Sequence, residues 1–189
     1  MQHEPELPTR RFTVDEVLRM VEVGILDEDE PLELVDGELL VVPPQSPPHA
    51  SLTTHLHDEL RAVYRDGYVV REAKPLVAGP HSLPEPDVAV CHGSNSDFTA
   101  RHPRGEEAVL VLEVARTSVR TDRKKAAAYA GAGVPTYWLI DLVSRKVEVH
   151  TDPRNEGHYA RVRVAAMGEE LELPELGVRW SVARVLTPG

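Results

Sequence analysis

The run AVLVLEVA at residues 108–115 constrains the fold more than any other part of the sequence. Seven of its eight residues are apolar, and Glu113 is the exception. A continuous apolar run of this length predicts a strand that is buried on both faces of a sheet. An unpaired carboxylate in such a strand would cost on the order of several kcal/mol or would take up a proton. Glu113 is therefore expected to face a partner, and it is the first candidate functional residue.

Length and composition favour one ordinary globular domain. The chain has 189 residues, of which 41% are hydrophobic and 5% aromatic. A chain of this length buries about 70% of its unfolded surface, so a single domain over residues 1–189 is expected. The one cysteine, Cys91, excludes an internal disulfide and a Cys-based metal site, and it is expected to be a small buried residue at a strand end.

Charge and hydropathy limit the cellular locations and the binding partners that we expect for this chain. No apolar run approaches the roughly 18 residues that span a membrane, and the N-terminus lacks a signal-peptide pattern, so a cytoplasmic location is expected. The net charge of −10 disfavours tight nonspecific binding of nucleic acid. The segment RTSVRTDRKK at residues 116–125 nevertheless concentrates five Arg and Lys residues after Glu113, either as a basic patch or as a solvated helix start.

The first half of the chain predicts two helices and a hairpin. Thr13 and Glu16 stand at capping-box spacing before apolar residues at helical intervals, which predicts a helix over residues 13–26. Asp36-Gly37 between two apolar runs is typical of a β-hairpin turn. Leucines at helical spacing predict a further helix over residues 49–64, after a proline-rich loop.

The second half predicts mainly strands. YVVREA, PDVAVC and the Glu113 run are read as strands, followed by an alanine-rich helix that starts at Thr121 or Asp122 and ends near residues 131–133. PTYWLID and KVEVHT predict a strand and its hairpin partner, and residues 158–188 are read as short C-terminal strands. The order predicts an α/β (α+β) domain with a central mixed sheet flanked by helices.

Asp87 is a natural companion for Glu113. It follows Pro86 at the start of the PDVAV strand. If the two strands are neighbours, their carboxylates converge at one sheet edge, where two oxygen ligands suit Mg²⁺ or Mn²⁺. The alternative is a turn-forming Asp after proline.

Two of the four lysines follow the Glu113 strand. Lys124 and Lys125 open the alanine-rich helix, and Lys125 shares a helical face with Tyr129. A lysine beside a carboxylate pair could orient an attacking water and stabilise charge on a phosphoryl oxygen. The alternative is a pair of solvated charges at a helix start.

These motifs resemble those of the PD-(D/E)XK nuclease superfamily, and more specifically the Uma-two family of restriction-endonuclease-like proteins of bacteria. The resemblance runs from about residue 30 to residue 150 and rests on the blocks ELVDGEL, SPPHASL, PEPDVAV, LEVARTS and DRKKAAAYAGAGVPTYWLID. It implies a restriction-endonuclease-like fold with a divalent-metal site. The N-terminal helix and the strands of residues 158–188 would be extensions of that fold.

The resemblance also assigns residues by position. Asp87 matches the Pro-Asp motif and Glu113 the second acid, while Ala115 stands where the superfamily name expects Lys. Lys125 matches a lysine displaced onto the following helix, although the spacing from Asp122 leaves Lys124 as an alternative. Glu33 and His49 match an early Glu and His that complete the metal shell or contact substrate. Their alternatives are an exposed hairpin charge and a helix-start residue.

Three readings of Glu113 remain open from the sequence. In the first, the protein is a Mg²⁺- or Mn²⁺-dependent endonuclease of DNA, with Asp87, Glu113 and the backbone carbonyl of Val114 on the metal and Lys125 at the attacking water. Paired cuts in duplex DNA would then favour a homodimer. In the second, the chain is a catalytically inactive binding module on a nuclease fold. In the third, Glu113 is only ion-paired, with Arg120 or a distant arginine.

Overall fold

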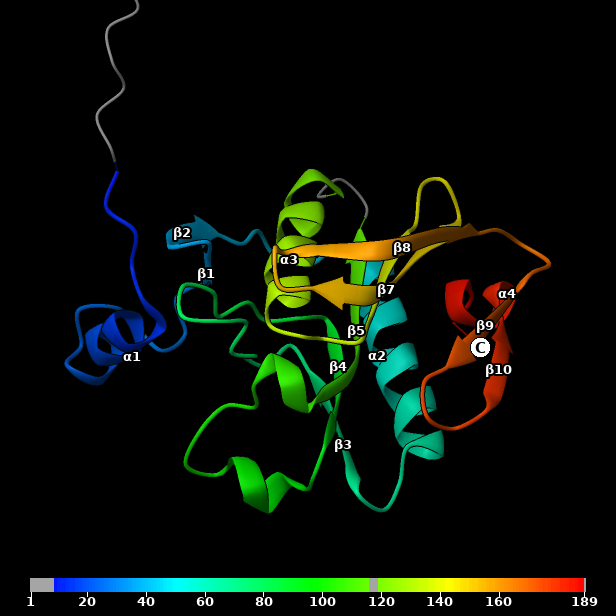
Figure 1. Ribbon diagram of the computed structural model, residues 1–189, viewed down its shortest axis with the longest axis horizontal. Helices are drawn as coiled ribbons and strands as arrows, with labels where there is room; N and C mark the ends of the chain where they lie inside the picture. The colour runs from blue at the N-terminus through cyan, green and yellow to red at the C-terminus, as the bar shows by residue number, and fades with distance from the viewer. Residues whose placement is uncertain (1–8, 116–118, 189) are drawn as a thin grey trace, which may run out of the picture.

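The centre of the molecule is a six-stranded mixed sheet. The computed structural model describes residues 9–115 and 119–188, and within them the sheet has the strand order β3-β4-β5-β6-β7-β8 (Figure 1). β5 and β6 are parallel, and the other neighbouring pairs are antiparallel. The expected mixed central sheet is confirmed. The strands are β3 (Tyr68–Glu72), β4 (Val88–His92), β5 (Ala108–Ala115), β6 (Thr136–Asp141), β7 (Lys146–Arg154) and β8 (His158–Ala165).

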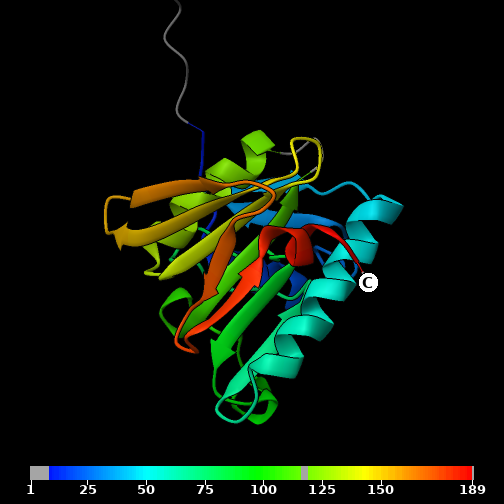
Figure 2. The same cartoon turned by 90° about the vertical axis from the view of Figure 1, so that its right-hand side faces the viewer.

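One helix covers each face of this sheet, as Figures 1 and 2 show. α2 (Pro47–Val63) packs Leu52, Leu56 and Leu60 against one face. α3 (Val119–Gly131) packs Tyr129 and neighbouring alanines against the other. β5 lies between the two helices, and all eight of its residues are buried. This two-sided burial is the reason that the strand is a continuous apolar run.

A β-hairpin leads into the site from the N-terminal side. β1 (Leu32–Val35) and β2 (Glu38–Val41) pair through a tight turn in which Asp36 and Gly37 have φ angles of 51° and 76°. Positive φ at both positions is the signature of a type I′ turn, which the Asp-Gly pair predicts. A Cβ atom at Gly37 would lie 2.4 Å from the Cβ atom of Arg11, so glycine is also required for space.

The N-terminal helix is shorter than expected. α1 (Val14–Glu22) begins at the predicted capping box, in which Thr13 and Glu16 bond each other's backbone N–H groups. It ends at Glu22, whereas the sequence predicted a helix to residue 26. Gly24 follows with a φ angle of 73°, and left-handed glycines commonly follow helix ends. α1 packs on the hairpin through a small apolar cluster that contains Val14, Val17 and Leu34.

The C-terminal region forms a second small sheet. β9 (Glu170–Leu173) pairs with β10 (Val178–Ser181), and Trp180 packs into the α2-side core. The prediction of strands to residue 188 is wrong for the last segment, because α4 (Val182–Leu186) is a helix capped by the Ser181 hydroxyl. Two 3₁₀ turns, η1 (Asn95–Phe98) and η2 (Gly105–Glu107), complete the described elements. None of the described helices has the length and hydropathy required to cross a membrane.

Candidate active site

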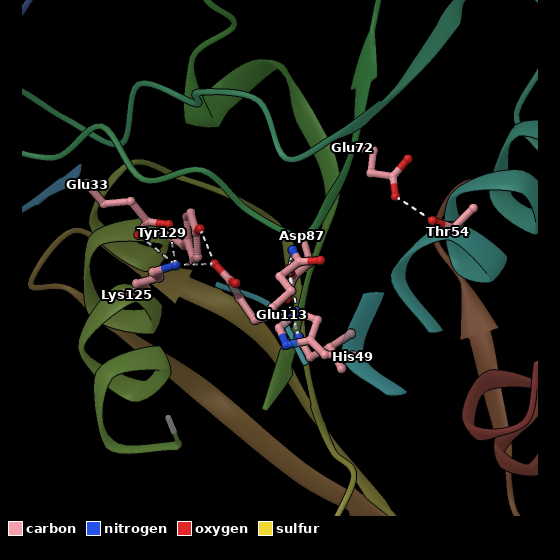
Figure 3. Close-up of polar contacts among 10 residues, drawn as sticks. Glu33, His49, Thr54, Glu72, Asp87, Glu113, Lys125 and Tyr129 are labelled. Atoms are coloured by element: carbon pink, nitrogen blue, oxygen red, sulfur yellow. Dashed lines mark hydrogen bonds and ion pairs between the residues drawn. The ribbon is translucent and has the colours of Figure 1, made fainter. Parts of the chain in front are cut away.

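Asp87 and Glu113 lie opposite each other at one edge of the central sheet. Val88, the first residue of β4, pairs with Leu112 of β5 in an antiparallel register, so the next residues outward are Asp87 and Glu113. Residues that face each other in antiparallel strands project to the same side of the sheet. Asp87 and Glu113 are therefore neighbours on one side of the sheet, and Figure 3 shows the Glu113 carboxylate directed toward Lys125 and Tyr129.

The first half of the site, here the Asp87 cluster, holds its carboxylate with a backbone N–H group, an amide side chain and a histidine ring. The backbone N–H of Val114 donates to Oδ2 of Asp87 over 2.7 Å, and the side-chain amide of Gln45 donates to Oδ1 over 3.1 Å. His49 Nε2 lies 2.7 Å from the same Oδ1 atom. Asp87 is only 6% exposed, so its carboxylate is fixed from three directions.

The position of His49 follows from the start of α2. His49 is the third residue of that helix, after the two prolines Pro47 and Pro48, which are favoured at a helix start. The N-terminal end of this helix, which is the positive end of its dipole, therefore lies beside the Asp87 carboxylate. Gln45, in the loop before α2, was not predicted from the sequence.

The second half of the site, here the Glu113 cluster, is built around a buried cation. Lys125 Nζ lies 3.2 Å from Oε1 of Glu113 and 2.7 Å from Oε2 of Glu33. The hydroxyl of Tyr129 donates to Oε1 of Glu113 over 2.7 Å. Lys125 and Tyr129 share the inner side of α3 because they are four residues apart. Glu113 thus has a cation and a phenol as partners, as the dashed lines in Figure 3 show.

Burial makes the Glu113 cluster a strongly coupled unit. Glu33, Glu113 and Lys125 are 5%, 3% and 6% exposed. Ion pairs at this depth depend on every partner, because removal of one leaves an uncompensated buried charge. Burial, and then the negative charges of Glu113 and Glu33, raise the pKa of Tyr129 well above its usual value, so the phenol remains a hydrogen-bond donor.

The electrostatic influence of the cluster extends to Glu85. Loss of hydration raises the pKa of this carboxyl, and the negative charge of Glu33 raises it further. The charges of Lys74 and Lys125 act in the opposite direction. Glu85 is two residues before Asp87, so the charges of the Glu113 cluster reach the segment that carries Asp87.

Several open alternatives from the sequence can now be compared with these positions. Lys125 points into the site, whereas Lys124 is exposed. Glu33 is buried, so the reading of an exposed hairpin charge is wrong. The side chain of Arg120, which the sequence offered as an ion-pair partner of Glu113, lies outside the described residues. α3 begins at Val119, two residues before the earlier of its two predicted starts.

The donor set fits a divalent cation with oxygen ligands. Asp87 and Glu113 offer two neighbouring carboxylates, and Mg²⁺ in proteins is commonly held by one or two carboxylates together with waters and substrate phosphates. The N–H and C=O groups of one strand residue point to the same neighbouring strand, so the carbonyl of Val114 faces the same side as its N–H, which donates to Asp87. No group of three or more His, Cys, Asp or Glu side chains in the described residues is arranged to hold a metal ion. A metal here would therefore need backbone, water or substrate oxygens as well.

Comparison with known proteins defines the class and then the family. The chain is similar to a crystal structure titled "a putative nuclease belonging to DUF820 from Anabaena variabilis ATCC 29413", with a TM-score of 0.73 over 93% of this chain and 97% of that chain. At 17% identity this similarity establishes the fold alone, which is the expected restriction-endonuclease-like fold.

The chain belongs to the Uma2 family, described as "Putative restriction endonuclease", whose model matches residues 14–185. The match extends well beyond the residues 30–150 that carried the resemblance in the sequence, and it takes in α1 and the C-terminal sheet. A search of curated proteins gave no significant match.

Proposed function

We propose that this protein is a divalent-metal-dependent endonuclease that hydrolyses phosphodiester bonds of DNA. The observation that carries the proposal is the pairing of Asp87 with Glu113 at one sheet edge, with the Lys125 ammonium on Glu113. Two carboxylates and one ammonium supply the groups needed to bind a cation and to stabilise charge on a phosphoryl group. The family membership supports the same reaction class.

Asp87, Glu113 and the carbonyl of Val114 would hold Mg²⁺ or Mn²⁺. When bound, the metal would lower the pKa of a coordinated water and neutralise charge on the scissile phosphate. The protein's own contribution is positional. The Val114 N–H group, Gln45 and His49 fix the Asp87 carboxylate, so that it is preorganised for a ligand.

Lys125 would orient the attacking water and interact with a non-bridging phosphate oxygen. Its ammonium is held between Glu33 and Glu113, which removes most of the conformational freedom of a lysine side chain. Tyr129 fixes the same oxygen of Glu113 that contacts Lys125. Lys125 on α3 thus supplies the ammonium that the superfamily pattern expects from the strand, where Ala115 stands instead.

The test is cleavage of supercoiled plasmid and of a linear duplex by purified Asp87→Ala and Glu113→Ala variants with millimolar Mg²⁺ or Mn²⁺. Loss of one ligand worth a few kcal/mol in the transition state lowers the rate by about 100-fold or more. Glu72→Gln is the matched control, because Glu72 lies opposite Val88 in β3 and its carboxylate bonds Thr54 instead. Circular dichroism would verify that each variant is folded.

The outcome separates this function from a catalytically inactive binding module. Undiminished cleavage by both folded alanine variants would contradict the proposed site. No cleavage by the wild type with either metal and no metal-dependent stabilisation would support the module, for which the net charge of −10 is the observation in favour.

A further inference from the structure

Four exposed cations of the described residues have no carboxylate partner and lie on segments that adjoin the strands of the candidate site. Arg145 and Lys146 lie at the β6–β7 turn, Lys124 lies on α3, and Lys74 lies in the segment between β3 and β4. We refer to these four residues as the basic rim. Among the described residues, none of them is within ion-pair distance of an Asp or Glu side chain.

This lack of pairing contrasts with most of the described arginines. Nine of them are ion-paired with a carboxylate: Arg10, Arg11, Arg19, Arg101, Arg123, Arg154, Arg163, Arg179 and Arg184. In a chain with a net charge of −10, an unpaired cation is available for an external anion, whereas a paired one is already neutralised locally. Five other described arginines also lack a carboxylate partner: Arg61 and Arg65 at the far end of α2, and Arg71, Arg104 and Arg161 elsewhere.

The rim residues of the β6–β7 turn lie beside the end of β5. The N–H of Leu142 donates to the carbonyl of Ala115 over 2.9 Å, and Ala115 is two residues after Glu113. Asp141 pairs with both Ala115 and Lys146 in the sheet register. Figures 1 and 2 both show this turn and the start of α3 at the same end of the molecule as the carboxyl end of β5.

The acidic groups on this end are largely engaged. The Asp141 carboxylate accepts the N–H groups of Val143 and Ser144, and Glu148 is bridged to Arg123. On the other flank, Lys74 lines the same pocket as Glu85 and the acidic segment of residues 27–30. The positive charge of the rim is therefore concentrated on the β6–β7 side of the Asp87–Glu113 pair.

We propose that the basic rim contacts the nucleic-acid phosphates that flank the scissile bond and so sets where a polyanion can approach this acidic protein. The inference rests on the proposed function, since it assigns the substrate contacts of that same site. Each rim cation that neutralises one phosphate would release condensed counterions and contribute about −0.9 to the slope of log K against log salt concentration. The partner chemistry is a phosphate backbone, which DNA and RNA share.

The test is equilibrium binding of a fluorescein-labelled duplex by anisotropy at several KCl concentrations. Wild type would be compared with the double variant Arg145→Ala/Lys146→Ala, in EDTA to prevent cleavage and again in Ca²⁺. The matched control is Arg61→Ala/Arg65→Ala, which removes the same two positive charges. Arg61 lies twelve residues along α2 from His49, about 18 Å at 1.5 Å per residue.

The rim variant is expected to lower the steepness of the salt dependence by about 1.8, while the control is expected to leave it unchanged. Equal slopes in the two double variants would overturn the inference. It would also be overturned if the wild type showed no binding at up to about 100 µM protein, the weak limit of ordinary nonspecific affinity.

The cleavage test of Asp87→Ala and Glu113→Ala remains independent of this measurement. A rim-dependent salt slope without any cleavage would remove the proposed enzyme and leave the binding surface. Cleavage by the wild type, together with a salt slope that the rim variant leaves unchanged, would support the enzyme and remove the rim as a phosphate contact. A duplex of RNA with the same sequence forms a further arm, and rim-dependent binding of RNA alone would sustain the rim while removing DNA as the substrate.

Discussion

The two halves of the candidate site hold their carboxylates by different physical means. In the Asp87 cluster the carboxylate lies against a backbone N–H group, an amide side chain and a histidine at the start of a helix, and 19% of the His49 side chain is exposed. In the Glu113 cluster the carboxylate is sealed against a lysine, a tyrosine and a second glutamate, each of them buried.

The difference predicts separate roles for the two halves. Buried charges stabilise a structure only as a complete set, so the Glu113 cluster must contribute strongly to folding as well as to chemistry. Donors at the mouth of a site contribute little to folding but can tune a ligand. If the account is correct, mutations in the two clusters should separate stability from metal affinity.

The largest expected effect follows from removal of the shared cation. Lys125→Met should destabilise the fold by about 3–5 kcal/mol, because Glu33 and Glu113 are left buried without their counter-charge. Urea denaturation at neutral pH measures this cost. Lys124→Met is the matched control and should change stability by less than about 0.5 kcal/mol, since Lys124 is exposed. Equal effects of the two substitutions would show that the buried cluster is not a unit.

A smaller effect is expected from the phenol on the same carboxylate. Tyr129→Phe removes a hydrogen bond to an ionised group and should cost about 1.5–3 kcal/mol. Tyr159→Phe removes a bond to the carbonyl of Val134 and should cost about 0.5–1.5 kcal/mol. Both tyrosines are buried, so the comparison isolates the charge of the acceptor. A larger cost for Tyr159→Phe would contradict the assignment of Glu113 as the ionised partner.

The smallest effect on folding is expected in the Asp87 cluster. Gln45→Ala removes one donor from an exposed loop residue and should change stability by no more than about 1 kcal/mol. Its effect on metal affinity should be larger, about 10- to 100-fold, because Gln45 orients a proposed ligand. Calorimetric titration with Mn²⁺ measures the affinity, with His57→Ala on the adjoining helix α2 as the control. Unchanged affinity in Gln45→Ala would remove Gln45 from the site.

Much of this architecture could be predicted from local sequence. The β5 strand is buried on both faces, as its apolar run indicates, and the Asp-Gly turn and the α2 leucines occur where periodicity predicts them. α4 was missed because a five-residue helix is too short to show a helical period. Helix α1 has its predicted start, but its end depended on the left-handed conformation of Gly24.

The site itself was only partly predictable. The strand order β4-β5 was enough to place Asp87 opposite Glu113, once the strands were assumed to be neighbours. The burial of Glu33 depends on Lys125, which is 92 residues away in sequence, and no local pattern reports such a pair. Gln45 gave no signal because it is a polar residue in a proline-rich loop without periodicity. The places of Glu33 and Gln45 in the site are set by tertiary contacts, which local sequence does not report.

The central claim is that Asp87 and Glu113 form one divalent-metal site. The most direct test is thermal unfolding of wild type, Asp87→Asn and Glu113→Gln, each first in EDTA and then in millimolar Mg²⁺ or Mn²⁺. A cation that binds only the native state must raise its stability, by about 2.7 kcal/mol at a concentration 100 times the dissociation constant. The account predicts a metal-dependent rise in Tm for the wild type that is lost in both variants. A rise of equal size in all three proteins would contradict it.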